Sequence, residues 1–212
     1  SPGFCAGKPA SLLKAKIIRI MKDELPQEAL SWNGCELGKG EIGELVVSGD
    51  HVCRDYFNNP QAVRENKIID ADGVLWHRMG DTGYFDDSGR FWLTGRVHST
   101  IFRNGLPVHP QLVEQAAKGD DARIGMAAAI GIPDAGCGEK VAVIVVLSEN
   151  IPDDTARRSI PGEVAGRIRN AGLVVDFIVL TEKPLPLDPR HNSKIDYGML
   201  RKRLSKKSLQ EA

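Results

Sequence analysis

Pro184-Leu-Pro-Leu-Asp-Pro-Arg-His-Asn-Ser-Lys-Ile-Asp196 is the stretch from which the rest of the sequence is best interpreted. Its prolines fix the backbone dihedral φ and favour an extended segment. An Asn-Ser turn then leads to Lys194, and Ile195 opens a periodic segment that indicates a short helix. The pattern therefore predicts a loop that presents one lysine, which such a loop can carry into a site on another domain.

Composition limits the classes of partner. The 212 residues include 28 basic and 28 acidic side chains, so the formal net charge is zero. A balanced charge gives no electrostatic reason to expect nucleic acid or an anionic membrane as a partner. The longest apolar run, Val141–Leu147, is too short to span a bilayer. Hydrophobic residues make up 42% of the chain, enough for a core in one domain or two.

The cysteines and the first residues bear on cellular location. The four cysteines are widely spaced and form no C-x-x-C pair, which favours reduced thiols in a cytoplasmic protein over a zinc site or a disulfide framework. The histidines show no metal-ligand spacing, so no metal site is predicted. No signal peptide is visible, and Ser1 stands where an initiator Met would be, so we expect a piece of a longer protein.

The first part of the chain predicts a mostly β subdomain. Alternating or apolar runs indicate strands at Lys14–Ile20, Gly43–Gly49, Val74–Arg78 and Phe91–Thr94. The Asp-Asp-Ser-Gly turn at 86–89 predicts a hairpin. A short helix is expected at 61–67, and no helix in this part is long enough to cover a sheet.

The second part predicts a small α+β domain. Apolar strands are expected at 123–132, 139–147 and 174–180, the first two joined by the loop 133–138. Helices are expected at 110–117, 155–170 and 195–204. Tyr197, Leu200 and Leu204 would share one face of the last helix. The fold class predicted for the whole chain is therefore α+β.

Six segments, in this order along the chain, resemble the motifs of the acyl-adenylate-forming enzymes, a superfamily of acyl-CoA synthetases, peptide-synthetase adenylation domains and luciferases. They are Gly43–Gly49 with Tyr56–Pro60, Trp76–Tyr84, Gly89–Arg96, Ile101–Gly105 with Val108–Pro110 and Glu114, Gly131–Glu139, and the opening stretch Pro184–Asp196. The amino-acid sequences of Trp76–Asp81 and Asp188–Lys194 resemble those of the long-chain acyl ligase and β-lactone synthetase branch of this superfamily. The resemblance covers nearly the whole chain.

The resemblance implies roles for three charged residues. Adenylation brings a carboxylate against the α-phosphate of ATP, and Lys194 matches the family lysine whose cation reduces the repulsion between these anions. Asp81 matches the aspartate that accepts hydrogen bonds from both ribose hydroxyls. Arg96 matches an arginine near the ribose and phosphate. A guanidinium suits that place because its N–H donors stand in a fixed fork and can bind the ribose and phosphate oxygens. A turn carboxylate and a surface ion pair are the structural alternatives for Asp81 and Arg96.

Two further residues match the family by position. His98 falls at the hinge about which the small domain rotates, although the family usually has Asp or Lys there. Gly105 matches the glycine beside which the pantetheine arm of CoA passes, with an ordinary turn glycine as the alternative. The sequence departs from the family at Ser193, where glycine is usual, and at Phe102, where lysine is usual. Arg103 follows Phe102, and this departure weakens the case for carrying over a CoA or phosphate contact from the family to this position.

The resemblance also implies a domain plan. Residues 1–95 would be the last β-rich subdomain of the large domain, 96–99 the hinge, and 100–212 the mobile small domain that carries Lys194. The family's phosphate loop and the segment that would hold the acyl pocket do not occur in this sequence. We therefore expect the missing N-terminal part of the same enzyme as a partner, and we expect the 212 residues alone to be inactive.

The implied function is that of an ATP-dependent acid–thiol ligase of the AMP-forming acyl-CoA synthetase type. It would use ATP, Mg2+ and CoA, with a carboxylic acid, expected to be a fatty acid, as substrate. One alternative is an adenylating enzyme that does not use CoA and forms an amide or a β-lactone, and a carrier-protein thiol is a further possible acceptor. A non-catalytic stand-alone module is the other alternative, which the joint presence of Asp81, Arg96 and Lys194 argues against.

Overall fold

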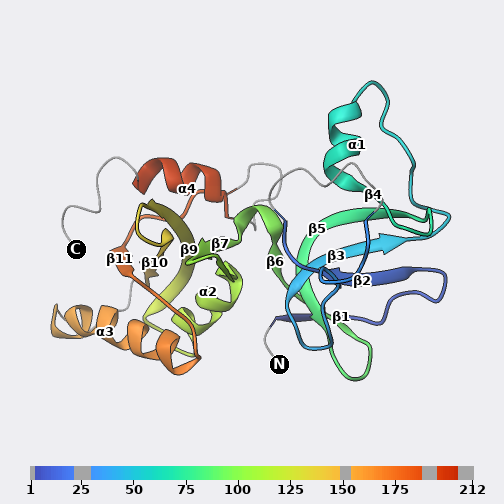
Figure 1. Ribbon diagram of the computed structural model, residues 1–212. Coiled ribbons are helices and arrows are strands. Elements are labelled where there is room, and N and C mark those ends of the chain that lie inside the picture. The colour runs from blue at the N-terminus through green and yellow to red at the C-terminus, as the bar shows by residue number, and fades with distance from the viewer. Residues whose placement is uncertain (1–2, 22–29, 149–153, 188–194, 205–212) are drawn as a thin grey trace. The chain divides into compact units, whose positions relative to one another are not determined.

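The computed structural model describes residues 3–21, 30–148, 154–187 and 195–204. The chain divides into two compact units, Ser1–His98 and Ser99–Ala212, each of which is described by itself (Figure 1). The division lies within the segment 96–99 that the resemblance assigns to a hinge. A hinge motion at this point stays a prediction.

The first unit is built on one sheet in which all the strand pairs are antiparallel. The strands follow the order β1 (Phe4–Gly7), β6 (Phe91–Arg96), β5 (Leu75–Phe85), β3 (Gly43–Ser48) and β2 (Lys14–Ile18), and β4 (Lys67–Ile69) pairs with β5. Helix α1 (Pro60–Asn66) has seven residues and begins after Asn59, whose side chain accepts a hydrogen bond from the backbone N–H of Ala62. The expected mostly β first part is therefore confirmed.

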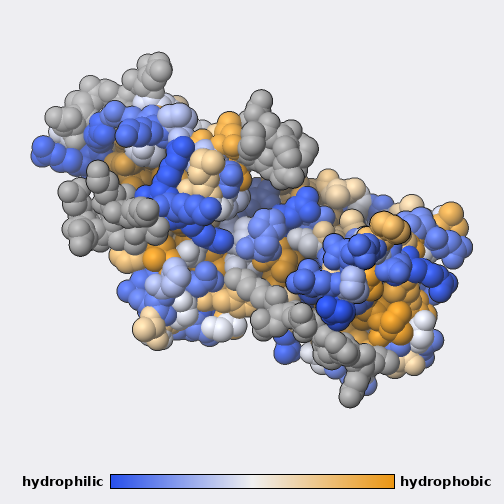
Figure 2. All heavy atoms as spheres, turned by 90° about the horizontal axis from the view of Figure 1, so that it is seen from above, coloured by the Kyte–Doolittle hydropathy of each residue, from blue (hydrophilic) through white to orange (hydrophobic). Residues whose placement is uncertain are grey.

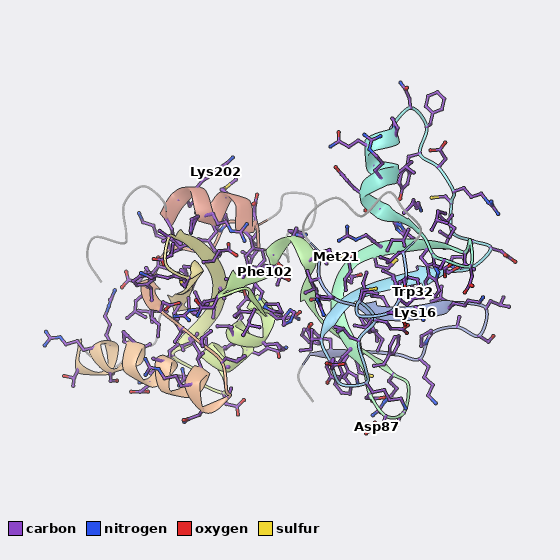
Figure 3. The ribbon with its side chains drawn as sticks, viewed as in Figure 1. Lys16, Met21, Trp32, Asp87, Phe102 and Lys202 are labelled. Carbon is purple, nitrogen blue, oxygen red and sulfur yellow. The ribbon has the colours of Figure 1, made fainter. Side chains whose placement is uncertain are left out.

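Tryptophans and one carboxylate organise the core of this unit. Trp76 is buried beside Ile18, Val46 and Ile68, and its indole N–H donates to Asp70 at 2.8 Å. Trp32 stands edge-on to Trp76, with ring centroids 5.1 Å apart, and donates to the same carboxylate oxygen. The ammonium nitrogen of Lys16 lies 5.1 Å from the ring centroid of Trp32. Both residues are labelled in Figure 3. These indoles are therefore packing residues.

The second unit is a sheet with helices on its two faces. Its strands follow the order β11 (Phe177–Thr181), β10 (Gly138–Leu147), β7 (Ile101–Arg103) and β8 (Leu106–Val108), and β9 (Ile124–Asp134) pairs with β10 along its length. Only the β10–β11 pair is parallel among the described pairs of this unit. Helix α3 (Asp154–Asn170) connects those two strands in the chain order, as a parallel pair requires.

Strict alternation along β9 and β10 creates the two faces. Ala127, Ala129, Val143 and Val145 join the core cluster that includes residues of α3 and α2 (Pro110–Lys118). Ala128, Ile130, Ala142 and Ile144 join the cluster that includes Leu200 and Leu204 of α4 (Tyr197–Leu204). Because successive side chains of a strand point to opposite faces, the run of apolar residues serves both cores. The predicted α+β fold class is confirmed, as is the shared apolar face of the last helix.

Some expected bounds differ from the observed ones, and some short elements were not expected. Strand β5 does not end at Arg78 but continues through the Gly-Asp-Thr-Gly segment to Phe85. Strand β11 begins at Phe177, later than expected, because Asp176 turns its carboxylate to the backbone N–H of Val141. The hairpin β7–β8 and the short strands β1 and β4 were not predicted.

Polar and charged side chains lie beside smaller apolar patches on the face shown in Figure 2. Large apolar side chains that are exposed include Leu12 and Phe57. Scattered apolar residues are normal on protein surfaces.

Candidate functional site

Asp81 and Arg96 come together where β5 and β6 pair. They are opposite each other in the register of the two strands, and Arg96 Nη1 lies 2.9 Å from Asp81 Oδ1. The Asp81 side chain is 18% exposed, whereas that of Arg96 is 50% exposed. The structure thus joins two of the residues selected from the sequence. It also places Asp81 in a strand, not in a turn.

An irregularity in β5 displaces Asp81 from the regular ladder. In the register of β5 with β3, the three residues Met79, Gly80 and Asp81 stand opposite the single residue Leu45. Gly80 has a φ of 67°, in the left-handed region that favours glycine. Such a bulge bends a strand and redirects its side chains. The backbone conformation of Gly80 therefore helps to determine the direction in which the Asp81 carboxylate points.

Tight packing fixes the strands directly behind the pair. A Cβ on Gly83 would lie 2.2 Å from the carbonyl oxygen of Trp92, so only glycine lets β5 approach β6 this closely. The buried hydroxyls of Thr82 and Thr94 are 3.2 Å apart, with Thr94 donating. These contacts hold the two strands in the register that brings Asp81 to Arg96.

The pair offers two kinds of polar group to a ligand. A carboxylate can accept two hydrogen bonds from neighbouring hydroxyls, and a guanidinium can donate several to phosphate oxygens. Because the Arg96 side chain is half exposed, its ion pair with Asp81 is worth less than about 1 kcal/mol and is easily exchanged for ligand contacts. The arrangement therefore fits a ligand that carries both hydroxyls and phosphates.

His98 is an exposed residue of the short 3-10 helix Val97–Ser99. The boundary between the two units falls directly after it. His98 therefore lies at the position that the family resemblance assigns to a hinge. Its role in a rotation is untested.

Gly105 forms the tip of the β7–β8 hairpin. Asn104 has a φ of 53° and Gly105 a φ of 75°, so both central residues of the turn are left-handed. This is the geometry of a type I′ turn, for which Asn-Gly is the preferred pair. A Cβ at Gly105 would meet no atom within 4 Å. Glycine is therefore required by the backbone, and the open space beside it leaves room for a ligand.

The two residues before this turn, Phe102 and Arg103, make hydrogen bonds within the second unit. Arg103 donates from Nη2 and Nε to the Asp176 carboxylate at 2.9 and 3.1 Å. The ion pair with Arg103, together with the Val141 N–H, holds the pKa of Asp176 below its usual range. Phe102, labelled in Figure 3, donates its backbone N–H to Glu139. Arg103 is thus a structural residue here, in keeping with the departure at position 102.

Lys194 lies outside the described residues. The chain is described on both sides of it, up to Leu187 and again from Ile195. Tyr197, which the sequence analysis treated only as part of an apolar helix face, hydrogen-bonds to Glu114. No pattern in the sequence indicated this polar contact, because the two residues are far apart in the chain and their meeting depends on tertiary packing.

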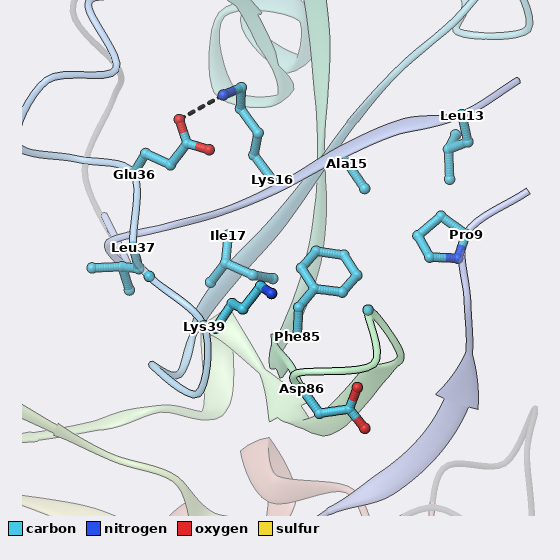
Figure 4. A pocket seen from close by; sticks show the side chains of 12 residues that line it. Pro9, Leu13, Ala15, Lys16, Ile17, Glu36, Leu37, Lys39, Phe85 and Asp86 are labelled. Carbon is cyan, nitrogen blue, oxygen red and sulfur yellow. Dashed lines mark hydrogen bonds and ion pairs between the residues drawn. The ribbon is translucent and has the colours of Figure 1, made fainter. Parts of the chain in front are cut away.

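A separate cavity of about 400 Å³ lies in the first unit (Figure 4). Its walls come from β2, the segment 36–39 and the β5–β6 hairpin, with Lys16 and Glu36 joined by an ion pair at one edge. Neither Asp81 nor Arg96 lines it. This cavity is therefore distinct from the candidate site.

The described part of the chain holds no metal cluster, no disulfide and no helix that could span a membrane. No group of three or more His, Cys, Asp or Glu side chains there could hold a metal ion. All four cysteines are free thiols. No helix among these residues is long and apolar enough to cross a membrane.

No family model matches the sequence, but individual proteins do. The olefin beta-lactone synthetase of Stenotrophomonas maltophilia strain K279a is 33% identical over 198 residues, which are 91% of this chain and 34% of that protein. The 4-chlorobenzoate–CoA ligase of an Arthrobacter species is 43% identical over 120 residues, which are 56% of this chain and 22% of that protein. The chain thus spans about a third or less of the length of these curated relatives.

Solved structures share the fold. ATP-bound MatB from Rhodopseudomonas palustris matches with a TM-score of 0.70 at 21% identity, covering 95% of this chain and 36% of that one. The amide bond synthetase McbA from Marinactinospora thermotolerans matches with a TM-score of 0.69 at 23% identity, covering 94% and 36%. At these identities the likeness concerns the fold alone.

Proposed function

We propose that this chain forms the C-terminal part of an acyl-adenylate-forming enzyme, an ATP-dependent acid–thiol ligase, because proteins that include a beta-lactone synthetase and a CoA ligase match it at 33% and 43% identity. The observation that carries the proposal is the Asp81–Arg96 pair. The two residues that the family resemblance assigns to the nucleotide lie opposite each other on β5 and β6, in ion-pair contact and partly open to solvent.

The proposed reaction has two steps. A carboxylate oxygen attacks the α-phosphorus of ATP, pyrophosphate leaves, and an acyl-adenylate forms. The sulfur of a thiol then attacks the acyl carbon, AMP leaves with the electron pair of the broken C–O bond, and the thiol proton is released. In the first step Lys194 would supply a cation to both anions, while Asp81 accepts from the ribose hydroxyls and Arg96 donates to nearby oxygens.

The cofactors are proposed to reach the enzyme in different ways. ATP would bind at Asp81 and Arg96. Mg2+ would arrive on the phosphates of ATP, since Mg2+ is commonly held by substrate phosphates and the described residues form no metal cluster. CoA would pass beside Gly105, where a Cβ would have open space. Each of these assignments is carried over from the family resemblance.

The remainder of the active site is proposed to lie in an N-terminal part of the same enzyme. The matched segments are 34% and 22% of the two relatives, and the phosphate loop and acyl pocket of the family have no counterpart in this sequence. We expect the 212 residues alone not to catalyse the reaction, because half of the transition-state contacts would be missing. The acid is proposed to be a fatty acid and the location cytoplasmic.

A second candidate is an adenylating enzyme that does not use CoA. The beta-lactone synthetase relative matches 91% of this chain, whereas the CoA ligase relative matches 56%. In such an enzyme a nucleophile within the acyl group, or an amine, would replace the thiol in the second step. The two candidates share the first step and all three charged residues.

Carboxylate-dependent exchange of pyrophosphate into ATP tests the shared first step. The longer protein that contains this chain would be assayed over a panel of fatty, β-hydroxy fatty and aromatic acids, with Mg2+ and ATP. Exchange with at least one acid is expected. Its absence with every acid would contradict the proposal and support a non-catalytic module.

AMP release with and without CoA separates the two candidates. A CoA-dependent release that yields an acyl-CoA supports the acid–thiol ligase. Release at the same rate without CoA, together with a cyclised product, supports the second candidate.

A further inference from the structure

The chain segments that the structure describes before and after Lys194 contact each other. Leu187 and Ile195 form an antiparallel bridge, and the N–H of Asp196 donates to the carbonyl oxygen of Pro186 at 2.8 Å. Leu185 and Ile195 also belong to the core cluster that contains Leu200. The described segments on the two sides of Lys194 are therefore held together.

Asp196 also fixes the start of helix α4. Its carboxylate accepts a hydrogen bond from the N–H of Met199 at 2.8 Å, and its carbonyl oxygen accepts one from Leu200 at 2.9 Å. A side-chain acceptor three residues before the donor is the standard N-cap arrangement. The helix therefore begins at a defined residue, three positions after Lys194 in the sequence.

Tyr197, the first residue of α4, is tied to a different part of the fold. Its hydroxyl donates to Glu114 Oε1 at 2.8 Å, and the same oxygen accepts from the N–H of Ala129, also at 2.8 Å. Glu114 lies on α2 and Ala129 on β9. One carboxylate oxygen thus joins three elements. Burial raises the pKa of Glu114, and burial together with this carboxylate raises the pKa of Tyr197.

We propose that Glu114 and Tyr197 form a positioning pair that fixes the first turn of α4 and so determines where the chain presents Lys194. This inference rests on the proposed function, because it acts through the lysine of the first step. The distance between a catalytic cation and the reacting oxygens must be held within a fraction of an ångström, and small misplacements reduce rates strongly. The pair touches neither substrate nor nucleotide in this proposal.

The test compares single and double variants of the longer protein by acid-dependent ATP–pyrophosphate exchange. Tyr197→Phe removes the donor and Glu114→Leu removes the acceptor, and each is expected to lower kcat about 10- to 100-fold with little change in KM for ATP. Glu114→Gln keeps an acceptor oxygen for both donors and is expected to stay within about threefold of the wild type. Backbone hydrogen exchange over residues 195–200 should quicken in Tyr197→Phe and stay unchanged in α3.

The double variant Lys194→Ala/Tyr197→Phe separates positioning from a general structural role. If Tyr197 acts through Lys194, adding Tyr197→Phe to Lys194→Ala lowers the residual exchange no further. A full additional loss in the double variant would overturn the inference, as would wild-type exchange in Tyr197→Phe, and both results would leave the proposed function intact. An absence of exchange in the wild type itself would overturn the proposed function and this inference with it.

Discussion

Asp81 owes its position to the backbone as much as to its side chain. The three residues Met79–Asp81 stand opposite Leu45, and the left-handed Gly80 allows this excess. Family resemblance was enough to select Asp81 and Arg96 from the sequence. Their ion pair could not be predicted, because it depends on the register of β5 and β6, which shifts between Thr82 and Gly83.

Asp81→Asn tests the ribose assignment at this residue. We expect a loss of about 10- to 100-fold in kcat/KM for ATP in the exchange assay, since the amide keeps one neutral acceptor oxygen and places an NH2 donor where the second carboxylate oxygen was. Thermal stability should hardly change, because the ion pair with Arg96 is partly exposed. Asp87→Asn is the matched control, since Asp87 is exposed at the tip of the same hairpin (Figure 3). Equal kinetics for the two variants would contradict the assignment.

His109 provides a prediction about pH. It is 6% exposed at the N-terminus of α2, and its Nδ1 has no hydrogen-bond partner among the described residues. Burial lowers its pKa to about 4, so the folded protein keeps the imidazole neutral where the unfolded chain binds a proton. As the pH is lowered from 6.5 towards the folded pKa, the free energy of unfolding should therefore decrease by about 1.4 kcal/mol per pH unit.

Urea unfolding at several pH values, for wild type and His109→Gln, measures this contribution. The difference between the two proteins should be constant above about pH 7 and should shrink as the pH falls below 6.5. His51→Gln, at an exposed histidine, serves as the control and should keep the wild-type pH dependence. Parallel curves for wild type and His109→Gln would show that His109 is not buried as described.

At the scale of elements, the regular parts of the fold were the predictable ones. The apolar run from Glu139 to Leu147 was identified as a strand, and its alternation supplies both core clusters of the second unit. The β7–β8 hairpin was missed, although Asn104-Gly105 is a strong hairpin signal, because the segment was interpreted only through its family motif. Strand β1 (Phe4–Gly7) carries no strong signal, since its pairing comes from contact with β6.

Gly105→Ala tests the left-handed turn of that hairpin. An L residue at a φ of 75° is expected to lower the free energy of unfolding by about 1–2 kcal/mol, although the added methyl group would meet no atom within 4 Å. Gly162→Ala in helix α3 is the matched control, because its methyl group would also enter open space. There we expect a gain of up to about 1 kcal/mol. Equal effects of the two substitutions on urea unfolding would contradict the described turn.

In the whole molecule, the candidate functional residues are divided between two compact units. The first unit holds the Asp81–Arg96 pair, and the second holds the bridge between the described segments that flank Lys194 and the positioning pair of Glu114 and Tyr197. Each core cluster draws its residues from one unit only. Such a division suits an enzyme whose lysine acts at a site on another domain. A rotation between the units, with His98 at the hinge, stays a prediction from the family resemblance, since composition and periodicity carry no signal for it.

Lys194 is proposed to serve the adenylation step. Acid-dependent ATP–pyrophosphate exchange would be compared among the longer wild-type protein, Lys194→Ala and Lys183→Ala, the last being an exposed lysine just before the same prolyl stretch. We predict a loss of at least about 100-fold for Lys194→Ala, because a cation that stabilises the transition state is removed, and wild-type exchange for Lys183→Ala. Exchange unaffected by Lys194→Ala would contradict the account.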